Sequence, residues 1–155
     1  MTLPLPTIAG VQSVICKLLM TTLDIENIEK SLDILLPEYY KKFMFNYPLD
    51  FANESTADYE LISYPEKLIE ENINAYKDLW GKQLNKQYFI IGENGCGDYF
   101  LIDLDQDNGV FSFFHDNQSF YIVANSLIEY ALKIPDGSFE LNWGNEKFKT
   151  KDLRK

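Results

Sequence analysis

The sequence predicts a single α+β domain in which an antiparallel sheet of about four to six strands is flanked by helices. Three observations support this. The chain of 155 residues has the usual size of one domain and holds no internal repeat. Apolar residues recur at helical spacing through its first half, and four short aromatic and β-branched runs follow. We therefore expect residues 1–155 to form one domain with its core at about 24–134.

The first two predicted helices each place apolar side chains on one face. The helix over 7–20 does so with Ile8, Val11, Ile15 and Leu18. The second begins near Thr21, Thr22 and Asp24, residue types that cap helix N-termini. Its apolar face consists of Ile25, Ile28 and Leu32.

Prolines and glycines bound the next two predicted helices. Pro37 can serve as the first residue of a helix that Pro48 ends. Its apolar stripe is Tyr40, Phe43, Met44 and Tyr47. After a loop at 50–58 and a short strand at 59–62, Ser63 and Glu66 match a capping box. The helix that follows is predicted to end at Gly81. Its inward-facing apolar residues are predicted to be Ile69, Ile73, Tyr76 and Trp80.

The second half of the sequence predicts consecutive antiparallel strands followed by a last helix. The strands are expected at 88–91, 98–104, 110–114 and 119–123, separated by Gly, Asn and Asp. Asn108-Gly109 predicts a type I′ hairpin turn. Asn125 or Ser126 can cap a helix through Ile134. The extension 135–155 is expected to be either a small hairpin or a flexible, lysine-rich end.

The charge balance restricts the class of partner. The net charge is -10, with 14 basic residues against 24 acidic ones. Phosphate binding relies on Lys and Arg, so neither nucleic acid nor an anionic membrane surface is the expected partner. A basic partner protein is favoured, because opposite net charge speeds encounter.

The cysteines and the N-terminal stretch indicate a cytoplasmic protein. Cys16 and Cys96 lack metal-site spacing and are expected to be free thiols in a reducing compartment. Gln12 and Lys17 interrupt the N-terminal apolar stretch, which therefore fits neither a signal peptide nor a membrane span.

Three motifs suggest chemistry, and each has a simpler explanation. Asp103-x-Asp105-x-Asp107 resembles the start of a calcium loop but lacks the Gly and Glu needed at its sixth and twelfth positions. Three glycines at 92, 95 and 97 do not have dinucleotide-binding spacing. His115 and Asp116 are neighbours, which on a strand point to opposite faces. We expect a structural or surface histidine, no cofactor, no metal and no catalysis.

Four segments together resemble the SMI1/KNR4 (SUKH) family. They are 36–43 (LPEYYKKF), 90–103 (IIGENGCGDYFLID), 110–116 (VFSFFHD) and 124–130 (ANSLIEY). The sequence departs from the family pattern at Asn46-Tyr47-Pro48, at Asn125 and at Leu127. The resemblance implies helices around an antiparallel sheet and no catalytic apparatus. It also implies a binding function, since most bacterial members bind and block toxins, nucleases among them, whereas fungal members act in cell-wall regulation.

An acidic stretch predicts where a partner would bind. No Lys or Arg lies between Lys86 and Lys133, whereas seven acidic residues do. Six of these are the predicted partner contacts: Glu93, Asp98, Asp103, Asp105, Asp107 and Asp116. The leading hypothesis is an immunity protein whose acidic surface binds a basic toxin domain. The alternatives are a regulatory or scaffold module for endogenous proteins, and an acidic face that serves only solubility.

Overall fold

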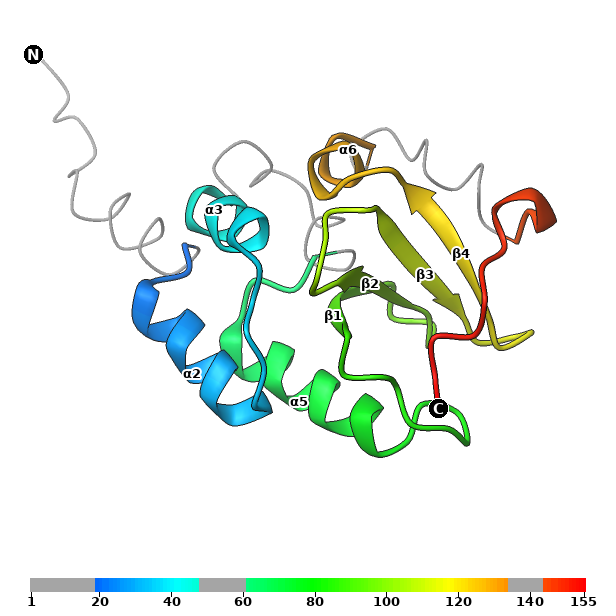
Figure 1. The fold of residues 1–155 in the computed structure, drawn as a ribbon, viewed down its shortest axis with the longest axis horizontal. Helices are drawn as coiled ribbons and strands as arrows, with labels where there is room; N and C mark the ends of the chain where they lie inside the picture. The colour runs from blue at the N-terminus through cyan, green and yellow to red at the C-terminus, as the bar shows by residue number, and fades with distance from the viewer. Residues whose placement is uncertain (1–18, 48–60, 134–143) are drawn as a thin grey trace, which may run out of the picture.

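The computed structural model describes residues 19–47, 61–133 and 144–155, and it shows the predicted α+β domain (Figure 1). The four strands form one antiparallel sheet in the order β1-β2-β3-β4, with each strand beside the next in sequence. Helices α2, α3 and α5 lie toward one side of the sheet, and α6 follows β4. The elements are α2 (Thr22–Leu32), α3 (Glu38–Asn46), α5 (Pro65–Lys77), β1 (Tyr88–Glu93), β2 (Tyr99–Asp103), β3 (Val110–Phe114), β4 (Ser119–Ala124), α6 (Leu127–Lys133) and the short helix η3 (Glu146–Phe148).

Local sequence signals determine where α2 and α3 begin. Thr21 caps α2 in a capping box with Asp24, and the predicted apolar face of α2 is buried. In α3, Tyr40 and Met44 are buried as expected. Pro37 is the N-cap rather than the first helical residue, because its extended ψ of 150° leaves it just outside the helix.

The start and the end predicted for α5 are wrong. Tyr64 is the N-cap without a side-chain hydrogen bond, and Pro65 opens the helix, so Ser63 and Glu66 form no capping box. The helix ends at Lys77, before Gly81. Trp80 and Gly81, both with positive φ, form a tight turn in which the Leu79 amide donates to the Lys82 carbonyl at 2.6 Å.

The buried face of α5 is also rotated from the predicted one. Leu68, Asn72 and Ala75 are buried, whereas Ile69, Ile73 and Tyr76 pack at the margin and Trp80 is half-exposed. Asn72 uses its side chain to hold the outer edge of β1. Its Oδ1 accepts from the Ile90 amide at 2.7 Å, and its Nδ2 donates to the Ile90 carbonyl at 2.9 Å.

The four predicted strands are confirmed, but the turn between β2 and β3 is not of type I′. Asn108 is absent from the residues with positive φ, and six residues rather than two connect the strands. Gly109 has a φ of +128°, and a Cβ there would lie 2.7 Å from the Ala124 carbonyl oxygen. Glycine is therefore needed at 109 for close packing against the end of β4.

Part of the predicted C-terminal extension packs against the domain. Residues 144–155 run beside β4 and then beside the segment after α5 (Figure 1). The Thr150 amide donates to the Phe120 carbonyl at 2.8 Å, and the Asn85 amide donates to the Leu153 carbonyl at 3.1 Å. Leu153 is buried in the core.

Several predictions fall on other parts of the chain. The helix predicted at 7–20 reaches the described residues only at 19 and 20, which are not helical. The rest of that helix with Cys16, the loop at 50–58, Ile134 and residues 139–143 of the possible hairpin lie outside the described residues. The described half of the strand predicted at 59–62, residues 61 and 62, is not a strand.

Residue 62 nevertheless hydrogen-bonds to the sheet. A bulge in β1 leaves Ile91 out of register, and the Ile91 carbonyl accepts from the Ile62 amide at 2.8 Å.

Candidate functional site

The six acids predicted as partner contacts lie at two opposite ends of the sheet. Consecutive antiparallel strands reverse direction, so the β1–β2 and β3–β4 turns share one end (the turn end), and the β2–β3 loop occupies the other (the loop end). A five-residue strand separates the ends by about 17 Å. The turn end holds Glu93, Asp98 and Asp116, and the loop end holds Asp103, Asp105 and Asp107.

At the loop end, one acid builds the loop and two are exposed. Asp103 is buried, and its carboxylate accepts from the Asp105 amide at 2.8 Å and from Asn108 Nδ2 at 3.2 Å. Asp105 and Asp107 are exposed, and neither forms an ion pair within the described ranges. Lys86 lines a hollow together with Asp105 but donates its Nζ to the Leu32 carbonyl at 3.2 Å.

At the turn end, Asp98 is a buried support rather than a surface charge. Its Oδ1 accepts from the His115 amide at 2.8 Å and lies 2.6 Å from His115 Nδ1. Asn94 Nδ2 donates to its other oxygen at 2.8 Å. Asp98 therefore joins the β1–β2 turn to the β3–β4 turn. The prediction of a structural histidine is consistent with this geometry.

The other acids of the turn end have basic partners. Glu93 pairs with Lys67 of α5 at 2.5 Å. Asp116 is exposed and lies 3.1 Å from His115 Nε2. Arg154 also reaches this end and donates to the Gln118 carbonyl at 3.3 Å. Of the six predicted contacts, the exposed acids that form no ion pair in the described ranges are thus Asp105 and Asp107, both at the loop end.

The pairing of His115 with Asp98 predicts a pH dependence. The hydrogen bond that the His115 ring donates to the Asp98 carboxylate raises the pKa of His115 above its usual 6.5. Desolvation opposes this shift, and the charges of Asp98 and Asp116 support it. A raised folded-state pKa contributes stability that is full below the unfolded pKa and is lost as the pH rises through the folded pKa. The single histidine should titrate above about 6.5 in the folded chain by NMR. The free energy of unfolding should fall through that range, and His115→Gln should remove this slope. A folded-state histidine pKa at or below the unfolded value would contradict this prediction.

The acids of the calcium-like motif lie in and next to the β2–β3 loop. Asp103 uses its carboxylate to hold the loop, and the side chains of Asp105 and Asp107 are exposed. Throughout the described part of the chain, no group of three or more His, Cys, Asp or Glu side chains is arranged to hold a metal ion. Cys96 is exposed in the β1–β2 turn.

A groove between α3 and α6 was not predicted from the sequence. Its volume is about 480 Å³, and its described lining is mostly apolar. The lining residues are Tyr39, Lys42, Phe43, Asn46, Tyr47, Ile128, Ala131 and Leu132. Leu127 and Ala131 of α6 face the core as predicted, but Ile128 and Leu132 are each 63% exposed. The signal was present in the sequence, since α6 is apolar on more than one face.

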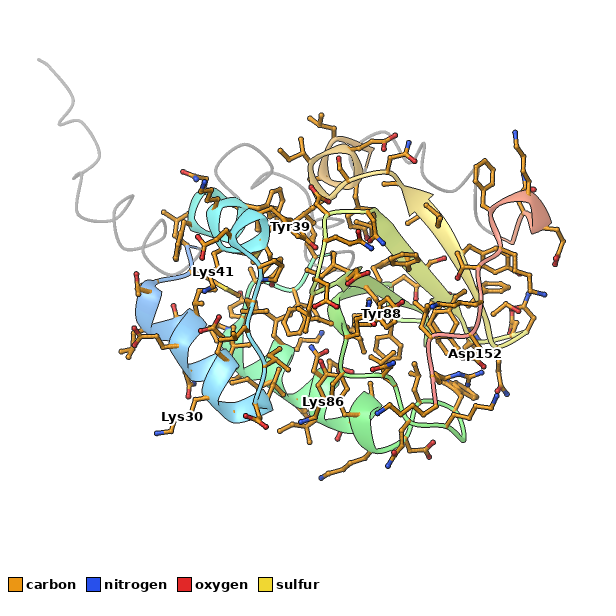
Figure 2. All side chains as sticks on the ribbon, in the orientation of Figure 1. Lys30, Tyr39, Lys41, Lys86, Tyr88 and Asp152 are labelled. Atoms are coloured by element: carbon orange, nitrogen blue, oxygen red, sulfur yellow. The ribbon has the colours of Figure 1, made fainter. Side chains whose placement is uncertain are left out.

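The groove borders the acidic loop end of the sheet. Tyr39 of α3 lines the groove, and its hydroxyl donates to the Asp103 carbonyl at 2.7 Å. Burial, followed by the nearby charges of Asp107 and Asp103, raises the pKa of Tyr39. Figure 1 shows the β2–β3 loop passing between α3 and α6, and Figure 2 shows Tyr39 on the side of α3 that faces this loop.

Comparison with known families identifies the chain. Residues 20–133 match the family model described as SMI1 / KNR4 family (SUKH-1). The chain belongs to the SMI1/KNR4 family. The match spans α2 through α6 and so includes the groove and both acidic ends of this SMI1/KNR4 domain, whereas residues 144–155 lie outside it. No curated protein matches the chain.

In the described ranges of this SMI1/KNR4 chain, no helix is both long and apolar enough to cross a bilayer.

Proposed function

We propose that this SMI1/KNR4 protein is an immunity protein, which binds a basic toxin domain in the cytoplasm and neutralises it without catalysis. Family membership supports a protein-binding role. The observation that carries the proposal is the exposed, unpaired acidic charge of Asp105 and Asp107 at the loop end. Such charges raise the association rate with a basic partner and help to exclude acidic ones.

A co-expression rescue tests the proposed function. The candidate toxin, taken as the C-terminal domain of any exported protein encoded by a neighbouring gene, would be expressed in a sensitive host, with and without the full chain. Rescue, with a 1:1 complex recovered, is the expected result. No rescue from a domain shown to be toxic, by a chain shown to be folded, would overturn the proposal and favour the regulatory or scaffold function.

Neutralising the loop-end acids should slow association with the toxin domain. The double variant Asp105→Asn with Asp107→Asn is expected to lower the association rate about tenfold at low ionic strength, with a smaller effect at high salt. The dissociation rate should change little, because exposed rim charges act mainly on encounter. Stopped-flow mixing at two salt concentrations measures both rates.

A matched variant separates local charge from net charge. Glu26 and Glu66 are exposed on α2 and α5, so Glu26→Gln with Glu66→Gln removes the same amount of charge elsewhere. This control should leave the association rate within about twofold of wild type. Equal slowing by the two double variants would show that only net charge matters, and the loop end would then not be the docking surface.

A further inference from the structure

The exposed face of α6 has no explanation in the packing of the described core. The inward face of this helix already supplies Leu127, Tyr130 and Ala131 to the core. Ile128 and Leu132 are four positions apart, so they lie one turn apart on the same face, and both are exposed. Two large apolar side chains held together in water are costly unless a partner covers them, and such patches commonly mark interaction sites.

The opposite wall of the groove is aromatic and held in place. Phe43 and Tyr47 stack with their ring centroids 5.4 Å apart, and Tyr47 is buried. The hydrogen bond from Tyr39 to the Asp103 carbonyl fixes the first turn of α3 against the β2–β3 loop. A preformed wall of this kind limits the side-chain entropy lost on binding.

The charges around the groove are arranged unevenly. At the Tyr39 end, Asp107 is close enough to raise the pKa of the tyrosine. Lys42 is the basic side chain among the described lining residues. An incoming surface would therefore place its own Lys or Arg toward the β2–β3 loop and its apolar side chain between α3 and α6.

From this arrangement, and resting on the proposed function, we infer that the α3–α6 groove, with its acidic edge at Asp107, is the docking site for the toxin domain. The recognised feature is an apolar or aromatic side chain next to a Lys or Arg. The apolar contact supplies most of the affinity, and the acids orient the approaching domain.

Polar substitution on the exposed face of α6 tests this inference. In the full chain, Ile128→Gln with Leu132→Gln should weaken binding of the neighbouring-gene toxin domain by about 30-fold or more. Because both side chains are exposed, the midpoint of urea unfolding should stay close to wild type. The matched control is Leu23→Gln with Tyr64→Gln, since Leu23 and Tyr64 are also exposed but lie on α2 and just before α5. Binding would be measured by calorimetry, and protection by the rescue assay.

The outcomes separate this inference from the proposed function. Rescue by wild type and by the control, with loss of rescue and of affinity in the α6 variant, supports the docking site. Rescue by all three with unchanged affinity overturns the groove and leaves the immunity function standing. Failure of the wild type itself to bind or rescue overturns both. Wild-type dimerisation in sedimentation that the α6 variant abolishes would assign the groove to a second copy and also overturn the inference.

Discussion

Replacing Arg154 with alanine is expected to lower the free energy of unfolding by about 3 kcal/mol. The Arg154 side chain is only 3% exposed and serves several partners at once. Its guanidinium donates to the carbonyls of Leu79 and Gln118 at 3.0 and 3.3 Å, and its charge lies 5.2 Å from the centre of the Phe113 ring. Alanine would leave these carbonyls without their donor and would uncover the ring.

The variants Arg154→Lys and Lys155→Ala are the controls for Arg154→Ala. Arg154→Lys keeps the charge but cannot reach several acceptors in the planar fork of a guanidinium, so we expect an intermediate loss. Lys155→Ala removes an exposed charge from the next position and should change stability by less than about 0.5 kcal/mol. Urea unfolding followed by fluorescence measures all three variants. A loss for Arg154→Ala no larger than that for Lys155→Ala would show that the contacts contribute little.

The pKa of Asp152, the ion-pair partner of Arg154, determines how far the pH can fall before this interaction is lost. Burial raises the pKa of Asp152, but hydrogen bonds from Arg154 and Lys82 outweigh it and hold the pKa at about 2, below the usual 3.8. A lowered folded-state pKa contributes stability that is present above the unfolded pKa and is lost as the pH falls through the folded one. Figure 2 shows Asp152 on the C-terminal segment. Its pair with Arg154 should therefore keep its stabilising effect down to about pH 4.

Replacing Asn72 with alanine is expected to destabilise the domain by about 3 to 4 kcal/mol. Asn72 is fully buried, and its amide bonds to both the N–H and the carbonyl of Ile90 and to the Leu68 carbonyl. Alanine would leave a buried amide and carbonyl on the outer edge of β1 without partners and would also create a small cavity. The cost of unsatisfied buried groups dominates the expected loss.

Asn74 of the same helix is the matched control for Asn72. It is exposed, so Asn74→Ala should change the free energy of unfolding by less than about 0.5 kcal/mol. Hydrogen exchange adds a direct readout, since the Ile90 amide should lose protection selectively in Asn72→Ala. Unchanged protection at Ile90 would contradict the proposed role of the side chain.

Features governed by neighbouring residues were predictable from the sequence. The start of α2 near Thr21, the buried stripe of α2 and the four strands depend on residues that are close together along the chain. The resemblance of four segments added the family, which the match over 20–133 confirms. The immunity function and the acidic docking surface remain predictions.

Features governed by distant contacts were predicted wrongly or missed. Asn108-Gly109 has the composition of a type I′ turn, but the buried carboxylate of Asp103 and the close approach of Ala124 select a longer loop. The face of α5 was misassigned because Asn72, polar by composition, is buried through bonds to a strand 18 residues away. Acids close in sequence were treated as one surface, whereas the strand reversals place them about 17 Å apart.

The connectivity of the sheet implies an order of assembly. Each strand pairs with its sequence neighbour, so the sheet can form through short loop closures. The hydrogen bond between Arg154 and Leu79 instead joins residues 75 positions apart. Arg154 can reach both of its carbonyl acceptors only when the turns at Leu79 and Gln118 have formed. We therefore expect the C-terminal segment to dock after the sheet has formed. Its release would expose the Phe113 and Phe120 rings while the hydrogen-bonded strands remain paired.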